Sequence, residues 1–474
     1  MGLTLAVDFG STFTKVAAVD LDKGELVGVA QSSTTVDSDI TLGLRAALDK
    51  LRGALGVETL DAQRIVSCSS AAGGLRMVVV GLVNELTTKA AREAALGAGA
   101  KLVGTYSYGL SPDDVRDIER IAPDLVLLTG GTDGGNEKVI IHNAEVLAAS
   151  RLESPVIIAG NKMAAAKVQS YLEAGGKYAM RVENVLPDLH SLHVEPARVA
   201  IRNIFMQRIT HAKGLDRAQE LVGDIIMPTP MAVLRGSALL ASGAGGEKGM
   251  GEVVVVDVGG ATTDVYSVAE GYPSQQEGII VKGLSEPYEK RTVEGDLGIR
   301  YNAHSILELA GSEIMTEKMN SVTEAIPQLD LEAAVKHLSD HVETLPQNEE
   351  DSLIDIGLAS TAVDIATKRH AGSLEETYFP SGKAKIQRGK DLTGVECVVG
   401  TGGICVYCRE PGCILASACF DKRSPESLRP LSPRFFVDGA YILYAAGLLA
   451  DISAEKAVKV IKANLREVEV PSSV

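Results

Sequence analysis

The stretch VVVVDVGGATTDVYSV at residues 253–268 decides the fold, because it joins an apolar strand, a carboxylate and a glycine turn in immediate succession. The stretch VDFGSTFTKVAAV at residues 7–19 aligns with residues 256–268 without a gap, and both contain V-D-x-G-x-x-x-T-x-V-x-x-V. One such segment alone is typical of a simple hairpin bend. Two copies, each opening a set of apolar segments, predict that the chain builds the same lobe twice.

Each copy is followed by further predicted elements. The first set comprises strands at 3–10, 13–21 and 25–31, a helix at 40–55, and strands at 63–69 and 77–82. The second set comprises strands at 252–259, 262–270 and 277–283, a largely helical stretch from about 299 to 376, strands at 395–400 and 435–438, and an apolar helix at 440–449.

Between the two sets, apolar strands alternate with helices of about 10 to 15 residues, which is typical of a parallel, Rossmann-like sheet. These strands are predicted at 101–109, 123–131, 154–161 and 178–186. We therefore expect an α/β protein with a first lobe at 1–96, an inserted α/β domain at 97–228, and a second lobe at 229–474 with a helical subdomain at about 299–376 and a C-terminal helix. Two related lobes facing each other would set both Asp-Gly turns on either side of one cleft.

The repeated turn has the chemistry of a phosphate site. Glycines let consecutive backbone N–H groups converge on one anion, and neighbouring hydroxyls add donors. Two carboxylates beside a phosphate require a cation, and Mg²⁺ fits because it uses one or two carboxylates and bridges phosphate oxygens. Asp8 and Asp257 are the predicted metal pair and catalytic residues, with Asp257 preferred for positioning an attacking water. The predicted phosphate-binding residues are Gly10, Ser11, Thr12, Gly259, Gly260, Ala261, Thr262 and Thr263.

A third glycine turn, VVGTGG at residues 398–403, also ends an apolar strand. Such a turn is either a plain βα connection or a place where the backbone approaches a base or ribose closely. Under the second interpretation Gly400, Thr401, Gly402 and Gly403 contact the nucleotide. Lys15 is either a phosphate ligand or a surface lysine.

In this order, VDFGSTFTK, VVVDVGGATTDV and VVGTGG resemble the two phosphate motifs and the adenosine motif of the actin, sugar kinase and heat-shock chaperone ATPases. The resemblance implies two actin-like, ribonuclease H-like lobes around ATP or ADP. Longer motifs are similar to the family of glutamate mutase accessory proteins, also called MutL and unrelated to the mismatch-repair protein of that name. These are SSAAGGLRMVVVGLVNELTTKAAREAALGAGAK, LLTGGTDGGN, RTVEGDLGIRYNA and FFVDGAYILYAAGLLA, and the match runs from residue 2 to about 449. Glu294, in RTVEGDLGIRYNA, completes the predicted nucleotide-binding set.

That family resemblance implies an ATP-dependent chaperone or reactivating factor for an adenosylcobalamin-dependent mutase, with cobalamin reached only through the client enzyme. Three alternatives stay open: an ATPase activator of a radical enzyme that carries an iron–sulfur cluster, a small-molecule kinase of the same fold, and a nucleotide-locked scaffold. The spacing of Cys405, Cys408, Cys413 and Cys419 allows either a metal site or small apolar core residues. The LLTGGTDGGN turn contacts corrinoid, contacts a partner, or is a flexible βα turn.

Charge and composition exclude some partners. The 474 residues include 46 basic and 62 acidic side chains, a net charge of −16, which repels nucleic acid. We find no leader-like segment and no apolar run long enough to span a bilayer, and six cysteines show no secretory spacing. The sequence therefore predicts a cytoplasmic protein without a membrane partner, and leaves the client mutase and a homodimer open.

Overall fold

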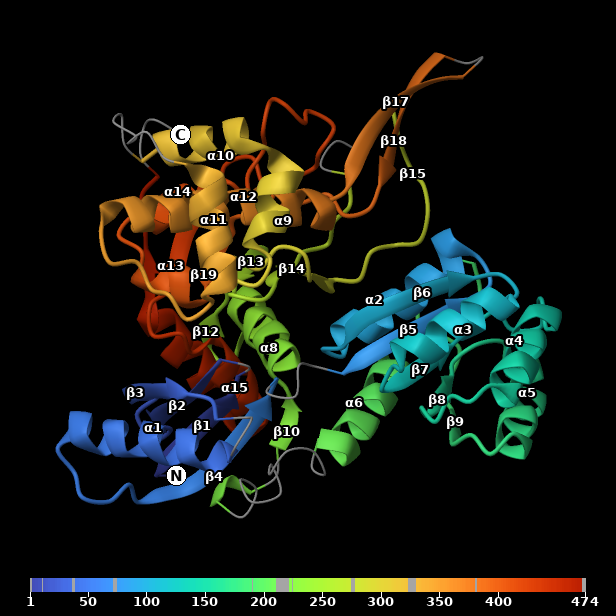
Figure 1. The fold of residues 1–474 in the computed structure, drawn as a ribbon, viewed down its shortest axis with the longest axis horizontal. Helices are drawn as coiled ribbons and strands as arrows, with labels where there is room; N and C mark the ends of the chain where they lie inside the picture. Colours follow the sequence, from blue (N-terminus) through green and yellow to red (C-terminus); the bar gives the residue numbers. More distant parts are fainter. Residues whose placement is uncertain are drawn as a thin grey trace. The chain divides into compact units, whose positions relative to one another are not determined.

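The computed structural model describes residues 2–10, 12–35, 39–70, 75–189, 191–209, 221–223, 225–273, 278–322, 330–379 and 382–470. These form two compact units (Figure 1). Unit 1 comprises Met1–Val233 and Gly283–Pro287, and unit 2 comprises Leu234–Lys282 and Tyr288–Val474. Over the ranges just given, no helix combines the length and the apolar character that crossing a bilayer requires.

The first lobe, in unit 1, is a five-stranded sheet in the order β10-β4-β1-β2-β3. β1, β2 and β3 pair antiparallel, whereas β4 and β10 join β1 as parallel strands. Asp39 caps the N-terminus of the lobe's helix, and Gly56 ends it in the left-handed conformation. The elements are β1 (Leu3–Phe9), β2 (Phe13–Asp20), β3 (Glu25–Ser33), α1 (Ile40–Leu55), β4 (Ala62–Ser69) and β10 (Ile225–Pro228).

The second lobe, in unit 2, repeats this topology. Its sheet has the order β16-β14-β13-β19-β20-β21. β13, β14 and β16 pair antiparallel, and β19 and β20 extend β13 as parallel strands. The strands are β13 (Val253–Val258), β14 (Thr263–Val268), β16 (Glu289–Glu294), β19 (Cys397–Thr401), β20 (Arg434–Asp438) and β21 (Leu465–Glu467). The predicted duplication is confirmed, with β13, β14, β16, β19 and β20 in the places of β1, β2, β3, β4 and β10.

One predicted strand of the second lobe was assigned to the wrong sheet. The apolar segment at 277–283 contains β15 (Ile279–Val281), which pairs with β18 in a separate three-stranded sheet. The third strand of the lobe is instead β16, which the sequence analysis did not identify, because its alternating charged residues hide the strand pattern. In Figure 1, β17 (Ser373–Phe379) and β18 (Gly382–Arg388) form a hairpin that extends away from the helices of unit 2.

The remaining elements of unit 2 are mostly helical, as predicted for about 299–376. Valines of β13 and β14 pack against these helices in one buried cluster. Asn348 caps α12, whose first turn is acidic and last turn basic, as the helix dipole favours. The elements are α9 (Ala303–Ala310), α10 (Ser312–Asn320), α11 (Leu331–Asp340), α12 (Glu349–His370), α13 (Gly403–Tyr407), α14 (Pro411–Ala416), α15 (Leu443–Asn464), β11 (Gly243–Ala244) and β12 (Glu247–Lys248), with α8 (Thr229–Ser242) beginning in unit 1.

The inserted domain is a five-stranded, fully parallel sheet in the order β6-β5-β7-β8-β9, which confirms the Rossmann-like prediction. Its central strand β5 lies between β6 and β7, whereas the sequence analysis placed this segment in the first lobe. On this pairing we propose that the insertion comprises about residues 75–223. Its elements are β5 (Arg76–Gly81), the π-helix η1 (Asn84–Thr88), α2 (Lys89–Gly97), β6 (Lys101–Ser107), α3 (Pro112–Ile121), β7 (Leu125–Leu128), α4 (Lys138–Ala149), β8 (Val156–Ile158), α5 (Lys162–Ala174), β9 (Ala179–Arg181) and α6 (Glu195–Ile209).

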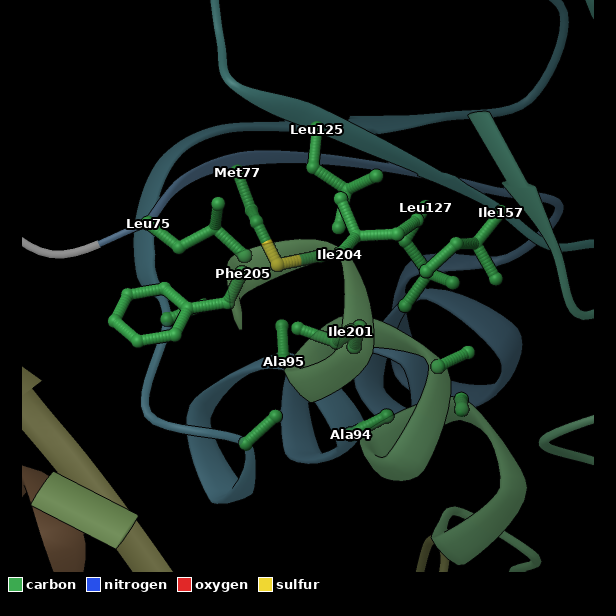
Figure 2. Close-up of a cluster of buried hydrophobic side chains, with 14 of the residues drawn as sticks. Leu75, Met77, Ala94, Ala95, Leu125, Leu127, Ile157, Ile201, Ile204 and Phe205 are labelled. Carbon is green, nitrogen blue, oxygen red and sulfur yellow. The ribbon is translucent and has the colours of Figure 1, made fainter. Parts of the chain in front are cut away.

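Helices cover both faces of the inserted sheet. Figure 2 shows Met77, Leu125 and Leu127 of the strands packed over the side chains of α2 and α6. The opposite face packs against α3, α4 and α5. The first cluster also contains side chains of the first lobe, so lobe and insertion share one buried core within unit 1.

A short segment from the second half of the sequence belongs to unit 1. In Gly283–Pro287, which connects β15 to β16, Leu284 is buried in the same cluster. Glu286 forms an ion pair with Lys89 at the start of α2.

Candidate functional site

The first copy of the motif sets Asp8 near the end of β1, where only 1% of the residue is exposed. The register puts Asp8 opposite Lys15 on β2 and opposite Cys68 on β4. Lys15 Nζ donates to Asp8 Oδ2 at 3.2 Å, and Thr229 Oγ1 donates to Asp8 Oδ1 at 2.5 Å. Both carboxylate oxygens therefore have a donor from the chain itself. The structure brings the predicted phosphate lysine and the predicted metal aspartate together.

Cys68 completes the surroundings of this carboxylate. Its Sγ lies 3.6 Å from Asp8 Oδ1 and 3.6 Å from Thr229 Oγ1. Burial, reinforced by the negative charge of Asp8, raises the pKa of the Cys68 thiol well above its usual value. The thiol therefore stays protonated and can donate to Asp8.

The turn after β1 is tightly closed. Gly10 N donates to the carbonyl oxygen of Phe13 at 3.1 Å, and a Cβ on Gly10 would lie 2.5 Å from that oxygen. Thr12 is exposed, and its carbonyl accepts from Thr34 N at 2.8 Å. Ser11 lies outside the described residues. The glycine is therefore required by the close approach of backbone to backbone.

The second copy sets Asp257 near the end of β13, opposite Asp264 on β14 and Thr401 on β19. Asp257 is half-buried, whereas Thr401 is fully buried and donates to Asp438 Oδ2 at 3.3 Å. Asp438 ends β20 and accepts from the N–H groups of Ile442 and Leu443 at 3.0 and 2.8 Å. The hydroxyl of Thr401 therefore helps to hold Asp438 at the junction between β20 and α15.

The turn at 259–262 is held by a segment that sequence reasoning singled out as a motif without giving it this role. Gly259 N donates to Thr262 O at 2.9 Å, which closes the turn. A Cβ on Gly298 would lie 2.2 Å from the carbonyl carbon of Ala261. The turn's carbonyls accept from Ile299 N, Arg300 N, Tyr301 N and Asn302 Nδ2.

Arg300 fixes this supporting segment to the helical part of unit 2. Its guanidinium donates to both carboxylate oxygens of Asp355 on α12, each at 2.7 Å, and both residues are buried. Burial raises the pKa of the Asp355 carboxyl, and the charge of Arg300 opposes that rise. Thr263, also buried, donates from Oγ1 to Leu297 O at 2.7 Å, so its hydroxyl supports the same turn.

Glu294 lies on the other face of the sheet from Asp257. The register pairs Glu294 with Thr263, whereas Asp257 pairs with Asp264, and side chains alternate faces along a strand. Glu294 forms an ion pair with Arg369 of α12 at 2.6 Å. Burial raises the pKa of Glu294, and Arg369 opposes the shift. The structure therefore does not bring Glu294 and Asp257 to one face.

Asp264 is the acidic neighbour that shares a face with Asp257. It is buried, accepts from Arg291 Nε at 2.8 Å, and accepts from Thr262 Oγ1 at 3.1 Å. This ion pair holds the hydroxyl of the predicted phosphate turn in a fixed direction. The link was not predicted, because Arg291 lies on β16, the strand that the sequence analysis did not identify.

The predicted adenosine motif lies beside the second phosphate motif. Gly402 has φ +93°, and a Cβ on it would lie 2.5 Å from Val258 O and 2.8 Å from Asp257 Oδ1. A Cβ on Gly400 would lie 2.7 Å from Leu415 Cδ2, so this glycine permits packing of α14. Gly403 begins α13, and no atom lies within 4 Å of the position that its Cβ would take. Space is also available at Gly260, where the nearest atom to such a Cβ lies 3.6 Å away.

Replacing Gly402 by alanine is expected to lower the free energy of unfolding by about 1–3 kcal/mol, because the methyl group meets backbone and carboxylate at a strained φ. It should also displace Asp257 and weaken nucleotide binding. Gly394→Ala is the matched control, since no atom lies within 4 Å of its ideal Cβ and it lies outside the predicted nucleotide motifs. Urea unfolding and nucleotide titration of both variants measure the difference; equal effects would contradict the prediction.

The four clustered cysteines do not converge on one point in the part of the chain that the structure describes, where no three His, Cys, Asp or Glu side chains form a metal-ligand group. Cys405 and Cys413 are buried. Burial raises the pKa of Cys408 to about 11 and that of Cys419 to about 12. Protonated, buried thiols of this kind behave as small apolar residues.

We call the residues around Asp8 the first half-site and those around Asp257 the second half-site. Carboxylate and hydroxyl oxygens dominate both, which fits a hard cation such as Mg²⁺. Asp257 presents a half-buried carboxylate at the strand end. Because both oxygens of Asp8 already accept from Lys15 and Thr229, Asp8 fits contact with a cation through water.

Known proteins similar to this chain were identified by sequence and by structure. Among solved structures, an activator of 2-hydroxyisocaproyl-CoA dehydratase from Clostridium difficile with bound ADPNP covers 96% of this chain and 95% of its own, at 11% identity and TM-score 0.31. A glycerol dehydratase reactivase covers 95% and 100%, at 10% identity and TM-score 0.34. With scores this low, the strand order of the chain itself, and not these alignments, establishes its fold.

The sequence matches are far closer. A family model described as MutL protein matches residues 4–465. Protein MutL from Clostridium tetanomorphum is 44% identical over 468 residues, which cover 99% of this chain and 100% of that protein. Matches of this extent show that the chain belongs to the MutL protein family.

Proposed function

We propose that the chain is an ATP-dependent chaperone that assembles or reactivates an adenosylcobalamin-dependent mutase of the glutamate mutase or aminomutase type. The observation that carries the ATPase part is the duplicated lobe, in which the same strand order ends twice in an aspartate and a glycine turn. The chaperone part is supported by membership of the MutL family and by the resemblance of the chain's longer motifs to glutamate mutase accessory proteins.

In this proposal both half-sites hold one magnesium–ATP. Asp257 would hold Mg²⁺ directly and Asp8 would hold it through water, and the ion would supply positive charge that offsets the charge of the triphosphate. Lys15, fixed by Asp8, adds a cation at the first turn. The N–H groups of the two glycine turns and the exposed hydroxyl of Thr12 bind phosphate oxygens, whereas the hydroxyls of Thr262 and Thr263 hold the second turn in shape. Asp257 orients the attacking water, and the turn at Gly402 approaches the nucleoside.

Nucleotide must change the chain enough to act on a client. Moving a two-state equilibrium from 1:99 to 99:1 requires about 5.5 kcal/mol of differential binding. Charge-assisted bonds from Lys15 and the two turns to a γ-phosphate, present with ATP and absent with ADP, are of a kind that supplies such a difference. The inserted domain, which shares its core with the first lobe, is the part proposed to contact the mutase.

The test uses the full chain and a purified glutamate mutase or aminomutase carrying an inactive cobalamin. We expect slow ATP hydrolysis without any small acceptor, stimulation by the loaded mutase, and release of cobalamin that follows hydrolysis. Co-precipitation with ATP but not with ADP identifies the client. Hydrolysis that depends strictly on a small metabolite, with that metabolite phosphorylated, would show a kinase instead.

A further inference from the structure

We infer that Thr229 is a positioning residue, which fixes the buried carboxylate of Asp8 and, through it, the ammonium of Lys15 for magnesium–ATP. The inference rests on the proposed function, and adds to it a residue outside the three nucleotide motifs. Thr229 donates to Asp8 Oδ1 at 2.5 Å, the opposite oxygen from the one that Lys15 holds at 3.2 Å.

Burial gives the donors of the chain control of the carboxylate. At 1% exposure, bulk water competes little for Asp8, so its orientation is set by Lys15 on one oxygen and by Thr229 on the other, where the Cys68 thiol adds a weaker and longer contact at 3.6 Å. A lysine on a flexible stem fixes only the oxygen it touches. The second donor, on the other oxygen, restrains rotation of the carboxylate plane and hence the place of the Lys15 ammonium.

The backbone around Thr229 is well suited to present a hydroxyl. β10 pairs with β4, with Met227 opposite Cys68 and Pro228 opposite Ser69, and Thr229 follows as the first residue of α8. Thr229 stands between Pro228 and Pro230, and each proline limits the local dihedral angles. The hydroxyl therefore reaches over Cys68 to Asp8 from a rigid junction.

The second lobe has a corresponding junction between a strand and a helix, at the end of β20 and before α15. There the residue that ends β20 before α15 is Asp438, whose oxygens accept from the N–H groups of Ile442 and Leu443. An ionised carboxylate donates no hydrogen bond. The side chain that ends the strand in the second half is thus an acceptor, whereas Thr229, directly after the strand in the first half, donates to a motif aspartate that faces a lysine.

The test compares Thr229→Val, which removes the hydroxyl at nearly constant volume, with Thr229→Ser, which keeps it. The control is Thr129→Val in the insertion, where another buried hydroxyl donates to Val80 O at 3.1 Å. Calorimetric titration with magnesium–ATP gives affinity, and thermal unfolding without nucleotide gives stability. We expect Thr229→Val to bind about tenfold more weakly, Thr229→Ser to bind nearly as the natural chain does, and Thr129→Val to leave affinity unchanged.

A double-substitution cycle separates positioning from mere packing. If Thr229 acts through Asp8 on Lys15, adding Thr229→Val to Lys15→Met should cost little further affinity. Should Thr229→Val not fold, Thr229→Ala removes the same hydroxyl with the same expected loss. Unchanged affinity in the hydroxyl-free variant, failure of serine to rescue, or fully additive losses would overturn the inference. Failure of the natural chain to bind magnesium–ATP would overturn the proposed function as well.

Discussion

Replacing Asp257 by asparagine is expected to slow ATP hydrolysis at least about 100-fold while nucleotide binding stays within a few-fold of the natural chain's. The substitution keeps the size of the side chain beside Gly402, so the turn that approaches Asp257 Oδ1 should stay in place. It removes the negative charge that the proposed mechanism uses to hold Mg²⁺ and orient water. Steady-state hydrolysis and titration with magnesium–ATP measure the two effects separately.

The control for this prediction is Asp340→Asn at the end of α11, where the exposed carboxylate forms a 2.6 Å ion pair with Lys336 that solvent screens. It should leave hydrolysis unchanged. If Asp257→Asn hydrolyses ATP at near the natural rate, the second half-site has been wrongly assigned. If the variant still supports mutase activity in cells although hydrolysis is lost, and a variant that cannot bind ATP does not, the chain acts as a scaffold.

Replacing Arg300 by methionine is expected to lower the free energy of unfolding by about 3–5 kcal/mol, because it leaves the buried carboxylate of Asp355 without its cation. The loss should extend to the phosphate turn. Arg300 N and Tyr301 N both donate to Gly260 O at 2.9 Å, so freeing this segment loosens the turn. Urea unfolding measures stability, and the magnesium–ATP affinity measured on the still-folded fraction should fall as well.

Two companion variants sharpen this prediction. Arg434→Met removes an exposed pair with Glu467 that has similar two-point geometry, at 2.9 and 2.8 Å, and should cost no more than about 1 kcal/mol. The double variant Arg300→Met with Asp355→Leu should recover much of the lost stability, because no buried charge remains. Similar losses for Arg300→Met and Arg434→Met would show that burial does not set the strength of the pair.

The repeat was predictable because its signal is local. Apolar alternation and an Asp-x-Gly turn specify a strand, its end and a close backbone approach within a few residues, and the two copies adopt the same strand order as each other. The contacts that shape the half-sites were not predictable. Thr229 reaches Asp8, and Arg300 reaches Asp355, only after distant segments pair, and nothing in the local pattern marks those partners.

Two other features were not predicted, for physical reasons: the face of the sheet on which Glu294 lies, and the sheet to which β5 belongs. The face that Glu294 occupies depends on its register with Thr263, and a shift of one residue would reverse it. β5 has the same apolar run whether it closes the first lobe or centres the inserted sheet. The sequence pattern identifies that strand but cannot choose between two sheets that both need a buried member.

The segment Gly283–Pro287 has a consequence for how this chain could have been inherited. Because it connects two strands of unit 2 yet contributes Leu284 and Glu286 to unit 1, no single break in the gene yields two complete parts. A recombination event that moved the second lobe alone into another gene would remove Leu284 from the core of unit 1. It would also leave Lys89 without its ion-pair partner Glu286. The two lobes and the insertion are therefore expected to travel through evolution as one indivisible unit.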